Sequence, residues 1–267
     1  GLPAGVFNVL PGFGHEAGAA LALHMDVDCI GFTGSTRTGR EILRMAAESN
    51  MKRAWTELGG KSANIVCADC PDLDAAVSAA IGSIYFNQGE SCNAPSRLFV
   101  EESIKEAFLE KAVAMIPRYA PGDPLDEATI MGAIVDETQM KTVMGYIQAG
   151  KDGGAKVLAG GEAVRTDSGG YYVAPTLFDQ VDNGMKIAQE EIFGPVLSVL
   201  SFTDVNEAVK QANATPYGLA AGVWTSDISK AIKVSRALRA GTVHVNQYDS
   251  DDITVPFGGY KQSGNGR

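Results

Sequence analysis

The sequence has 267 residues, of which 45% are hydrophobic and 20% charged, with a formal net charge of −10 and a pI near 4.8. Its apolar runs are shorter than the ~18 residues that a membrane span needs, so we expect a globular chain of one or two domains with no membrane partner. The acidic balance argues against nucleic acid, because phosphates require clustered Lys and Arg. The four cysteines lack the spacing of a secreted disulfide scaffold, so we expect a reducing, cytoplasmic compartment.

The predicted elements alternate between strands and helices from the start of the chain. Two short apolar strands are each followed by a helix within the first sixty residues. Because parallel neighbouring strands need a crossover helix, this alternation predicts βαβ units. The four elements are expected at residues 6–10, 16–25, 29–33 and 36–48.

The rest of the chain continues the same pattern. Asp72 is a candidate N-cap for a helix whose apolar positions, from Leu73 to Ile84, recur every three or four residues. Further strands are expected at residues 63–68, 97–100, 196–201, 221–224 and 242–245, and further helices at residues 104–114, 137–149, 205–212 and 228–238. The fold class is therefore α/β, and a change of composition near Gly59 predicts domains at residues 1–58 and 59–267.

Three local motifs resemble binding sites but fail on detail. Residues 12–17 fit the dinucleotide pattern G-x-G-x-x-A, yet the acidic residue expected about twenty positions on is absent, so a plain strand-to-helix turn is predicted. Gly59-Gly-Lys-Ser62 lacks the first glycine of a P-loop, and Cys67-Ala-Asp-Cys70 lacks a second cysteine pair for zinc. None of the three histidines stands in a metal-binding arrangement, so no metal site is predicted.

Three other features describe one catalytic site when they are taken together. Cys92 lies in a polar loop between a helix and a strand, where a thiol is accessible and can react as a thiolate. Glu57 precedes two glycines at the predicted boundary and suits a general base if burial raises its pKa. Gly34, Ser35 and Gly39 lie between a strand and a helix and could approach a phosphate. Taken separately, each has a plain alternative: a loop cysteine, a solvated glutamate and an ordinary capped helix start.

Five segments, in this order, carry the strongest pattern in the chain. They are Phe32-Thr-Gly-Ser-Thr36, Glu57-Leu-Gly-Gly-Lys-Ser62, Phe86-Asn-Gln-Gly-Glu-Ser-Cys92, Glu190-Glu-Ile-Phe-Gly-Pro195 and Pro256-Phe-Gly-Gly-Tyr-Lys-Gln-Ser-Gly264. In their order and spacing they resemble the NAD(P)-dependent aldehyde dehydrogenases. Within that family the chain is most similar to bacterial enzymes that oxidise amino-, guanidino- or γ-glutamylamino-butyraldehyde in putrescine and arginine breakdown.

The resemblance implies a fold and a set of residue roles. We expect the end of a Rossmann-type cofactor domain followed by an α/β catalytic domain with a mostly parallel sheet. Cys92 would attack the aldehyde, and Glu57 would activate the water that hydrolyses the resulting thioester. NAD, with NADP possible, would be bound by Gly34, Ser35, Gly39, Leu58, Glu191 and Phe193.

The resemblance also covers only part of the family pattern. Roughly the first two fifths and a short C-terminal segment have no counterpart here, so we expect a fragment that is inactive alone. The full-length protein would be a homo-oligomer, either a dimer or a tetramer. Glu90 stands where the family commonly has glutamine, and we expect its charge to raise the pKa of the Cys92 thiol.

The loop before Pro256 predicts a substrate class. Tyr248 is followed by an acidic stretch that includes Asp251 and Asp252. These groups could hold the distal ammonium or guanidinium of an aldehyde by charge and by cation–π attraction, the latter worth about 0.5–2 kcal/mol. A solvated acidic turn is an equal alternative. For the whole protein, the alternatives are an acylating dehydrogenase that uses coenzyme A and a catalytically silent binding protein.

Overall fold

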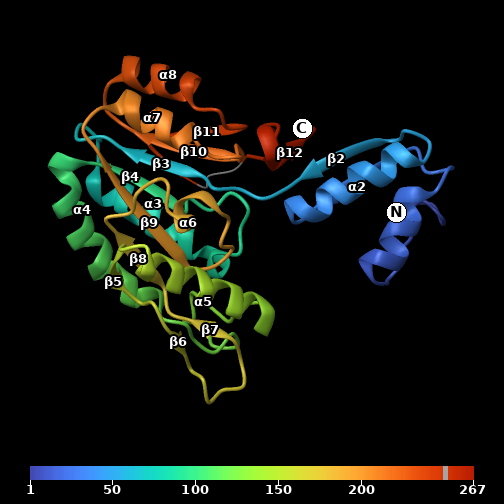
Figure 1. Ribbon diagram of the computed structural model, residues 1–267, viewed down its shortest axis with the longest axis horizontal. Helices are drawn as coiled ribbons and strands as arrows, with labels where there is room; N and C mark the ends of the chain where they lie inside the picture. Colours follow the sequence, from blue (N-terminus) through green and yellow to red (C-terminus); the bar gives the residue numbers. More distant parts are fainter. Residues whose placement is uncertain (249–251) are drawn as a thin grey trace.

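The computed structural model describes residues 1–248 and 252–267, which form a smaller and a larger lobe (Figure 1). The helices of the described residues are η1 (Gly14–Gly18), α1 (Ala19–Leu23), α2 (Thr36–Glu48), α3 (Leu73–Tyr85), η2 (Phe86–Gly89), α4 (Glu102–Met115), η3 (Ile116–Tyr119), α5 (Glu137–Asp152), α6 (Lys186–Gln189), α7 (Val205–Asn213), α8 (Ile228–Ala237) and η4 (Lys261–Ser263). The strands are β1 (Cys29–Thr33), β2 (Arg53–Glu57), β3 (Ala63–Val66), β4 (Arg97–Glu101), β5 (Lys156–Ala159), β6 (Ala163–Val164), β7 (Tyr172–Val173), β8 (Thr176–Asp179), β9 (Val196–Phe202), β10 (Ala220–Trp224), β11 (Thr242–Val245) and β12 (Gly264–Asn265).

Each lobe is organised around its own sheet. The smaller lobe contains the sheet β1-β2-β12, in which the C-terminal strand β12 returns to pair with β2. The larger lobe contains the sheet β11-β10-β3-β4-β9-β8-β5, and β6 and β7 form a separate hairpin. Neighbours in the large sheet are parallel except for β5 and β8, which confirms the predicted α/β fold with a mostly parallel sheet.

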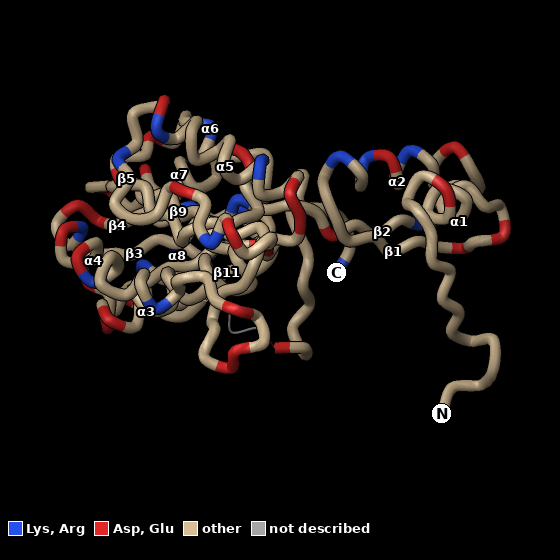
Figure 2. Tube along the Cα trace, turned by 90° about the horizontal axis from the view of Figure 1, so that it is seen from below, with Lys and Arg blue, Asp and Glu red and all other residues tan. Residues whose placement is uncertain are grey.

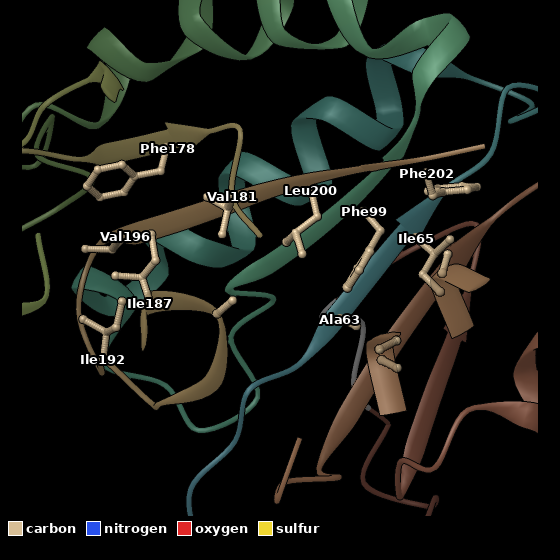
Figure 3. Close-up of a cluster of buried hydrophobic side chains, with 14 of the residues drawn as sticks. Ala63, Ile65, Phe99, Phe178, Val181, Ile187, Ile192, Val196, Leu200 and Phe202 are labelled. Atoms are coloured by element: carbon tan, nitrogen blue, oxygen red, sulfur yellow. The ribbon is translucent and has the colours of Figure 1, made fainter. Parts of the chain in front are cut away.

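The core of the larger lobe lies on both faces of its sheet. Along β4, Leu98 and Val100 pack in the cluster that α3 and α4 cover, whereas Phe99 points into the opposite cluster, against α5, α7 and α8. Figure 3 shows Ile65 of β3, Phe99 of β4 and Leu200 of β9 in this second cluster. Strands buried on both faces need continuous apolar runs, and this explains why they could be predicted from the sequence.

Aspartate residues fix the starts of four helices. The Asp72 carboxylate accepts a hydrogen bond from the Ala75 N–H at 2.9 Å, which confirms the predicted N-cap of α3. Asp136, Asp204 and Asp227 cap α5, α7 and α8 in the same way. Each such cap stabilises its helix by about 1 kcal/mol, because it satisfies N–H groups that have no partner within the helix.

The N-terminal segment departs from the prediction. Residues 6–10 form turns and irregular backbone rather than a strand, and Val6, Val9 and Leu10 are exposed. A strand requires a neighbour for its hydrogen bonds, but within the described residues β1 pairs only with β2. Figure 2 shows this segment extending away from the smaller lobe. The helix predicted at residues 16–25 is split into a π-turn, η1, and the short α1.

Among the described residues no helix is both long enough and apolar enough to cross a membrane. The predicted division into residues 1–58 and 59–267 stays a prediction.

Candidate active site

The candidate residues gather where the two lobes meet. Glu57 is the last residue of β2, and the segment from Leu58 to Ser62 leads directly into β3. The loop that carries Cys92 leads into the start of β4, and Glu191 lies shortly before β9. The site therefore lies between the carboxyl ends of the strands in the small sheet and the amino ends of the strands in the large one.

The loop that carries Cys92 has an unusual backbone. After α3 ends, Asn87 and Gln88 both have positive φ angles, 47° and 58°, and Gly89 follows at 71°. A Cβ atom on Gly89 would collide with the carbonyl of Gly194, so this turn requires glycine. Residues other than glycine in this conformation are strained and cluster at functional sites. The compact turn leaves Cys92 half-buried, in line with the accessible thiol that was predicted.

Two contacts fix the backbone at Cys92 and at the residue that follows it. The Gly60 backbone packs so closely on the Cys92 carbonyl that a Cβ atom at position 60 would overlap with its oxygen. The hydroxyl of Tyr248 donates a hydrogen bond of 2.8 Å to the carbonyl of Asn93. The thiol therefore stands on a loop held by the segment before β3 and by the segment after β11.

The electrostatic environment keeps the Cys92 thiol protonated. Burial raises its pKa, and the nearby carboxylates of Glu191 and Glu57 raise it further, because both disfavour a thiolate. We expected Glu90 to have this effect, but burial raises the pKa most, and the carboxylates that add to it are those of Glu191 and Glu57. Glu90 instead accepts a hydrogen bond of 3.2 Å from the Val135 N–H. A nucleophile in this setting needs a base to accept its proton.

The carboxyl group of Glu57 has the raised pKa that was expected of a general base. Its Oε2 is buried and has no hydrogen-bond partner among the described residues. Burial raises the pKa of its carboxyl group, and the positive charge of Arg267 partly offsets this effect. A raised pKa makes a glutamate carboxylate a stronger base, which suits it to accept a proton from water.

Glu191 lies against the same glycine pair. Its Oε1 accepts a hydrogen bond of 3.0 Å from the Gly60 N–H, and a Cβ on Gly59 would collide with its Oε2. Burial raises the pKa of Glu191, whereas the Gly60 hydrogen bond and Lys61 lower it. Nearby Phe193 has a positive φ of 54° and is 39% exposed.

The turn between β1 and α2 is joined to the strand that carries Glu57. The Gly34 N–H donates a hydrogen bond of 3.0 Å to the Glu57 carbonyl, and the Leu58 side chain packs tightly against Gly39. Ser35 Oγ accepts a hydrogen bond of 3.2 Å from the Thr38 N–H, so Ser35 is the N-cap of α2. The capped helix start is thus present, and its exposed N-terminus also suits a phosphate.

The predicted substrate residues lie in different surroundings. Tyr248 is buried and its ring lies 5.1 Å from that of His244. Asp252 is exposed and accepts hydrogen bonds from Thr254, which lower the pKa of its carboxyl group. Together with Phe257 and several aliphatic residues, Asp252 and His244 line a groove of about 950 Å³. Asp251 lies outside the described residues.

Ser263 connects the C-terminal segment to the glycine pair through hydrogen bonds, which the motif around Ser263 does not predict. This serine is fully buried, and its Oγ donates a hydrogen bond of 2.7 Å to the Gly59 carbonyl. The same oxygen accepts a hydrogen bond of 2.9 Å from the Gly218 N–H, and the Ser263 carbonyl accepts one from the Leu58 N–H. The C-terminal segment therefore holds the glycine pair between Glu57 and Cys92.

Comparison with known proteins identifies the family and agrees with this fold. The model of the aldehyde dehydrogenase family matches residues 1–267, so the chain belongs to that family. It is 52% identical over its whole length to the NADP/NAD-dependent aldehyde dehydrogenase PuuC of Escherichia coli strain K12, of which it covers 53%.

Two solved structures are closer still in sequence. A mutant of the P. syringae indole-3-acetaldehyde dehydrogenase AldA, in complex with NAD+ and IAA, is 60% identical with a TM-score of 0.98. The gamma-glutamyl-gamma-aminobutyraldehyde dehydrogenase from Burkholderia cenocepacia is also 60% identical, with a TM-score of 0.97. Each match covers 100% of this chain and 54% of the other, so this chain spans about half the length of these relatives.

Proposed function

We propose that the chain supplies the nucleophile, the general base and part of the cofactor site of an NAD(P)-dependent aldehyde dehydrogenase, which oxidises an aldehyde to a carboxylic acid. One observation carries the proposal. The carboxylates of Glu57 and Glu191 both lie near enough to the Cys92 thiol to raise its pKa, and all three residues border the Gly59-Gly60 pair.

The residues present fit a nicotinamide dinucleotide. Gly34 and Ser35 are exposed at the N-terminus of the thirteen-residue helix α2, where backbone N–H groups and the helix dipole favour a phosphate. Glu191 offers a carboxylate that suits a ribose hydroxyl. When bound, the cofactor accepts a hydride from the substrate carbon. The names of PuuC and of the AldA complex record NADP or NAD for those relatives, which supports the same cofactor here.

The chain's own residues account for the remaining steps. Solvent accepts the proton of the Cys92 thiol, and Sγ forms a bond to the aldehyde carbon. The Cys92 N–H is a candidate donor to the developing oxyanion. After the hydride has left, the acyl group remains on Sγ as a thioester. Glu57 then accepts a proton from water while the water oxygen attacks the acyl carbon. The C–S bond breaks, Glu57 passes that proton to the departing Cys92 sulfur, and the carboxylic acid is released.

For the substrate, we propose an ω-amino, guanidino or γ-glutamylamino butyraldehyde. The groove beside His244 is largely apolar and carries the carboxylate of Asp252, a combination that suits an aliphatic chain with a distal cation. The activity named for the Burkholderia relative supports this substrate class. The indole-3-acetaldehyde dehydrogenase has the same sequence identity to this chain, and its name supports an aromatic aldehyde as the alternative substrate.

The test is NADH formation by the whole protein with NAD and 4-aminobutyraldehyde, butyraldehyde or indole-3-acetaldehyde. We expect activity that Cys92→Ser abolishes and that Cys29→Ser leaves unchanged, because Cys29 is an exposed thiol on β1. We expect Asp252→Asn to lower the preference for the amino-aldehyde over butyraldehyde. An unchanged preference would rule out the charged groove, an acyl-CoA product would favour the acylating alternative, and silence towards every aldehyde would favour the binding protein.

A further inference from the structure

A small cavity behind the glycine pair has a basic lining. It has a volume of about 20 Å³ and lies between the starts of β3 and β4, the loop after α7 and the segment after α8. Lys61, Arg97 and Arg239 line it, and no carboxylate is found among its described lining residues. Three basic side chains around one cavity are unexpected in a chain with a net charge of −10.

Arg97 brings a positive charge to this cavity without a carboxylate to neutralise it. The side chain is 1% exposed, and its guanidinium donates to the carbonyls of Lys61, Gln211 and Ala212 and to the side-chain oxygen of Asn183. All these acceptors are neutral. The hydrogen-bonding capacity of Arg97 is therefore satisfied, but its charge is not, and a buried charge without a counterion is unfavourable.

Lys61 and Ser62 add two polar atoms that have no partner. Lys61 is 1% exposed, and neither its Nζ nor the Oγ of Ser62 makes a hydrogen bond within the described part of the chain. Burial and the repulsion of Arg97 lower the pKa of Lys61 to about 7, although the carboxylates of Glu191 and Glu190 oppose this shift. An ammonium group and a hydroxyl are both donors, so the cavity offers donors and positive charge to one small species.

We propose that this cavity is a binding site for a single small monovalent anion of the size of chloride, held by Lys61 and Ser62 and by the charge of Arg97. The volume of the cavity limits the size of the anion. On the same scale a cavity that holds one water measures about 10–15 Å³, so a phosphate or a carboxylic acid would not fit. The anion offsets one of the two buried positive charges and gives both unpartnered donors an acceptor. None of the proposed cofactor or substrate residues lines the cavity, and the inference does not depend on the proposed reaction.

Diffraction from bromide-containing crystals of the chain tests the site directly. Data collected at the bromine absorption edge are expected to show an anomalous peak within hydrogen-bond distance of Lys61 Nζ and Ser62 Oγ. Density in the cavity without an anomalous signal would mean that water alone occupies it, and an empty cavity in bromide would equally overturn the proposal.

Thermal unfolding gives an independent test in solution. We expect the Tm of the chain to rise by a few degrees and then saturate as sodium chloride replaces sodium gluconate at constant ionic strength, since a ligand that binds only the folded state stabilises it. Lys61→Met should abolish this rise, and Ser62→Ala should shift it to higher chloride. Lys141→Met, a control on the exposed face of α5, should keep it. A chloride response that survives in Lys61→Met would contradict the site.

Discussion

Gly60 packs so closely on the Cys92 carbonyl that one methyl group added at position 60 should displace the nucleophile. An ideal Cβ on Gly60 would lie 2.1 Å from the Cys92 carbonyl oxygen, whereas real Cβ atoms keep at least 3.0 Å from such neighbours. In Gly60→Ala the loop must therefore move by about 1 Å, the difference between these distances. A displacement of this size at a reacting group lowers the rate by about 10²-fold, equivalent to ~2.7 kcal/mol of activation free energy.

The assay is kcat/KM of the whole protein for its best aldehyde, with Tm measured on the same samples. Gly145→Ala is the matched control, because a Cβ on this exposed glycine of α5 meets nothing within 4 Å. That variant should keep its activity and gain up to about 1 kcal/mol of stability. Gly60→Ala should remain folded but lose about two orders of magnitude in rate. A folded Gly60→Ala variant that keeps its rate within threefold would show that the contact does not position Cys92.

Three further predictions follow from the same geometry. Tyr248→Phe removes one hydrogen bond to the buried Asn93 carbonyl, so we expect kcat to fall about tenfold with little change in KM for butyraldehyde. Because the Glu191 carboxylate raises the pKa of Cys92, Glu191→Gln should move the pH midpoint of Cys92 alkylation by iodoacetamide downward, as followed by peptide mapping; an unmoved midpoint would contradict this assignment. The pKa of Lys61 is about 7 in the folded chain and about 10.4 in an unfolded one. Between pH 7 and this higher pKa the unfolded state therefore binds more protons than the folded state. Lys61 thus adds to the free energy of unfolding a contribution that rises with pH. Urea unfolding from pH 7 to 10 in chloride-free buffer should show that Lys61→Met loses this contribution.

The parts of the fold that could be predicted are those with a local pattern. The apolar runs of β3, β4 and β9 are visible in the sequence because both faces of the large sheet are buried. By contrast, β2 has the sequence Arg-Ala-Trp-Thr-Glu, with little apolar character, and is a strand because β1 and β12 pair with it. The two residues of β12 carry no pattern at all. Strands β2 and β12 are about two hundred residues apart in the sequence, so neither segment alone predicts that they pair.

The candidate site divides in the same way. Cys92, Glu57 and the turn at Gly34 stand in recognisable segments, and the structure brings the turn to Glu57 through a backbone hydrogen bond. The roles of Ser263 and Tyr248 in fixing that site depend on single hydrogen bonds to Gly59 and Asn93, far away in the sequence. Such contacts exist only once the chain has folded, so the type and spacing of residues do not predict them.

The most direct measurement of the central claim is the mass of the Cys92 peptide in a Glu57→Gln variant of the whole protein. The variant is mixed with NAD and aldehyde, quenched in acid and digested. If Glu57 activates the water that releases the acyl group, the variant should form NADH once per site and carry the mass of the acyl group on Cys92, while the wild type carries none at the end of the reaction. NADH formation without an acyl group on Cys92, or an acyl group on another residue, would contradict the assignment of Cys92 and Glu57.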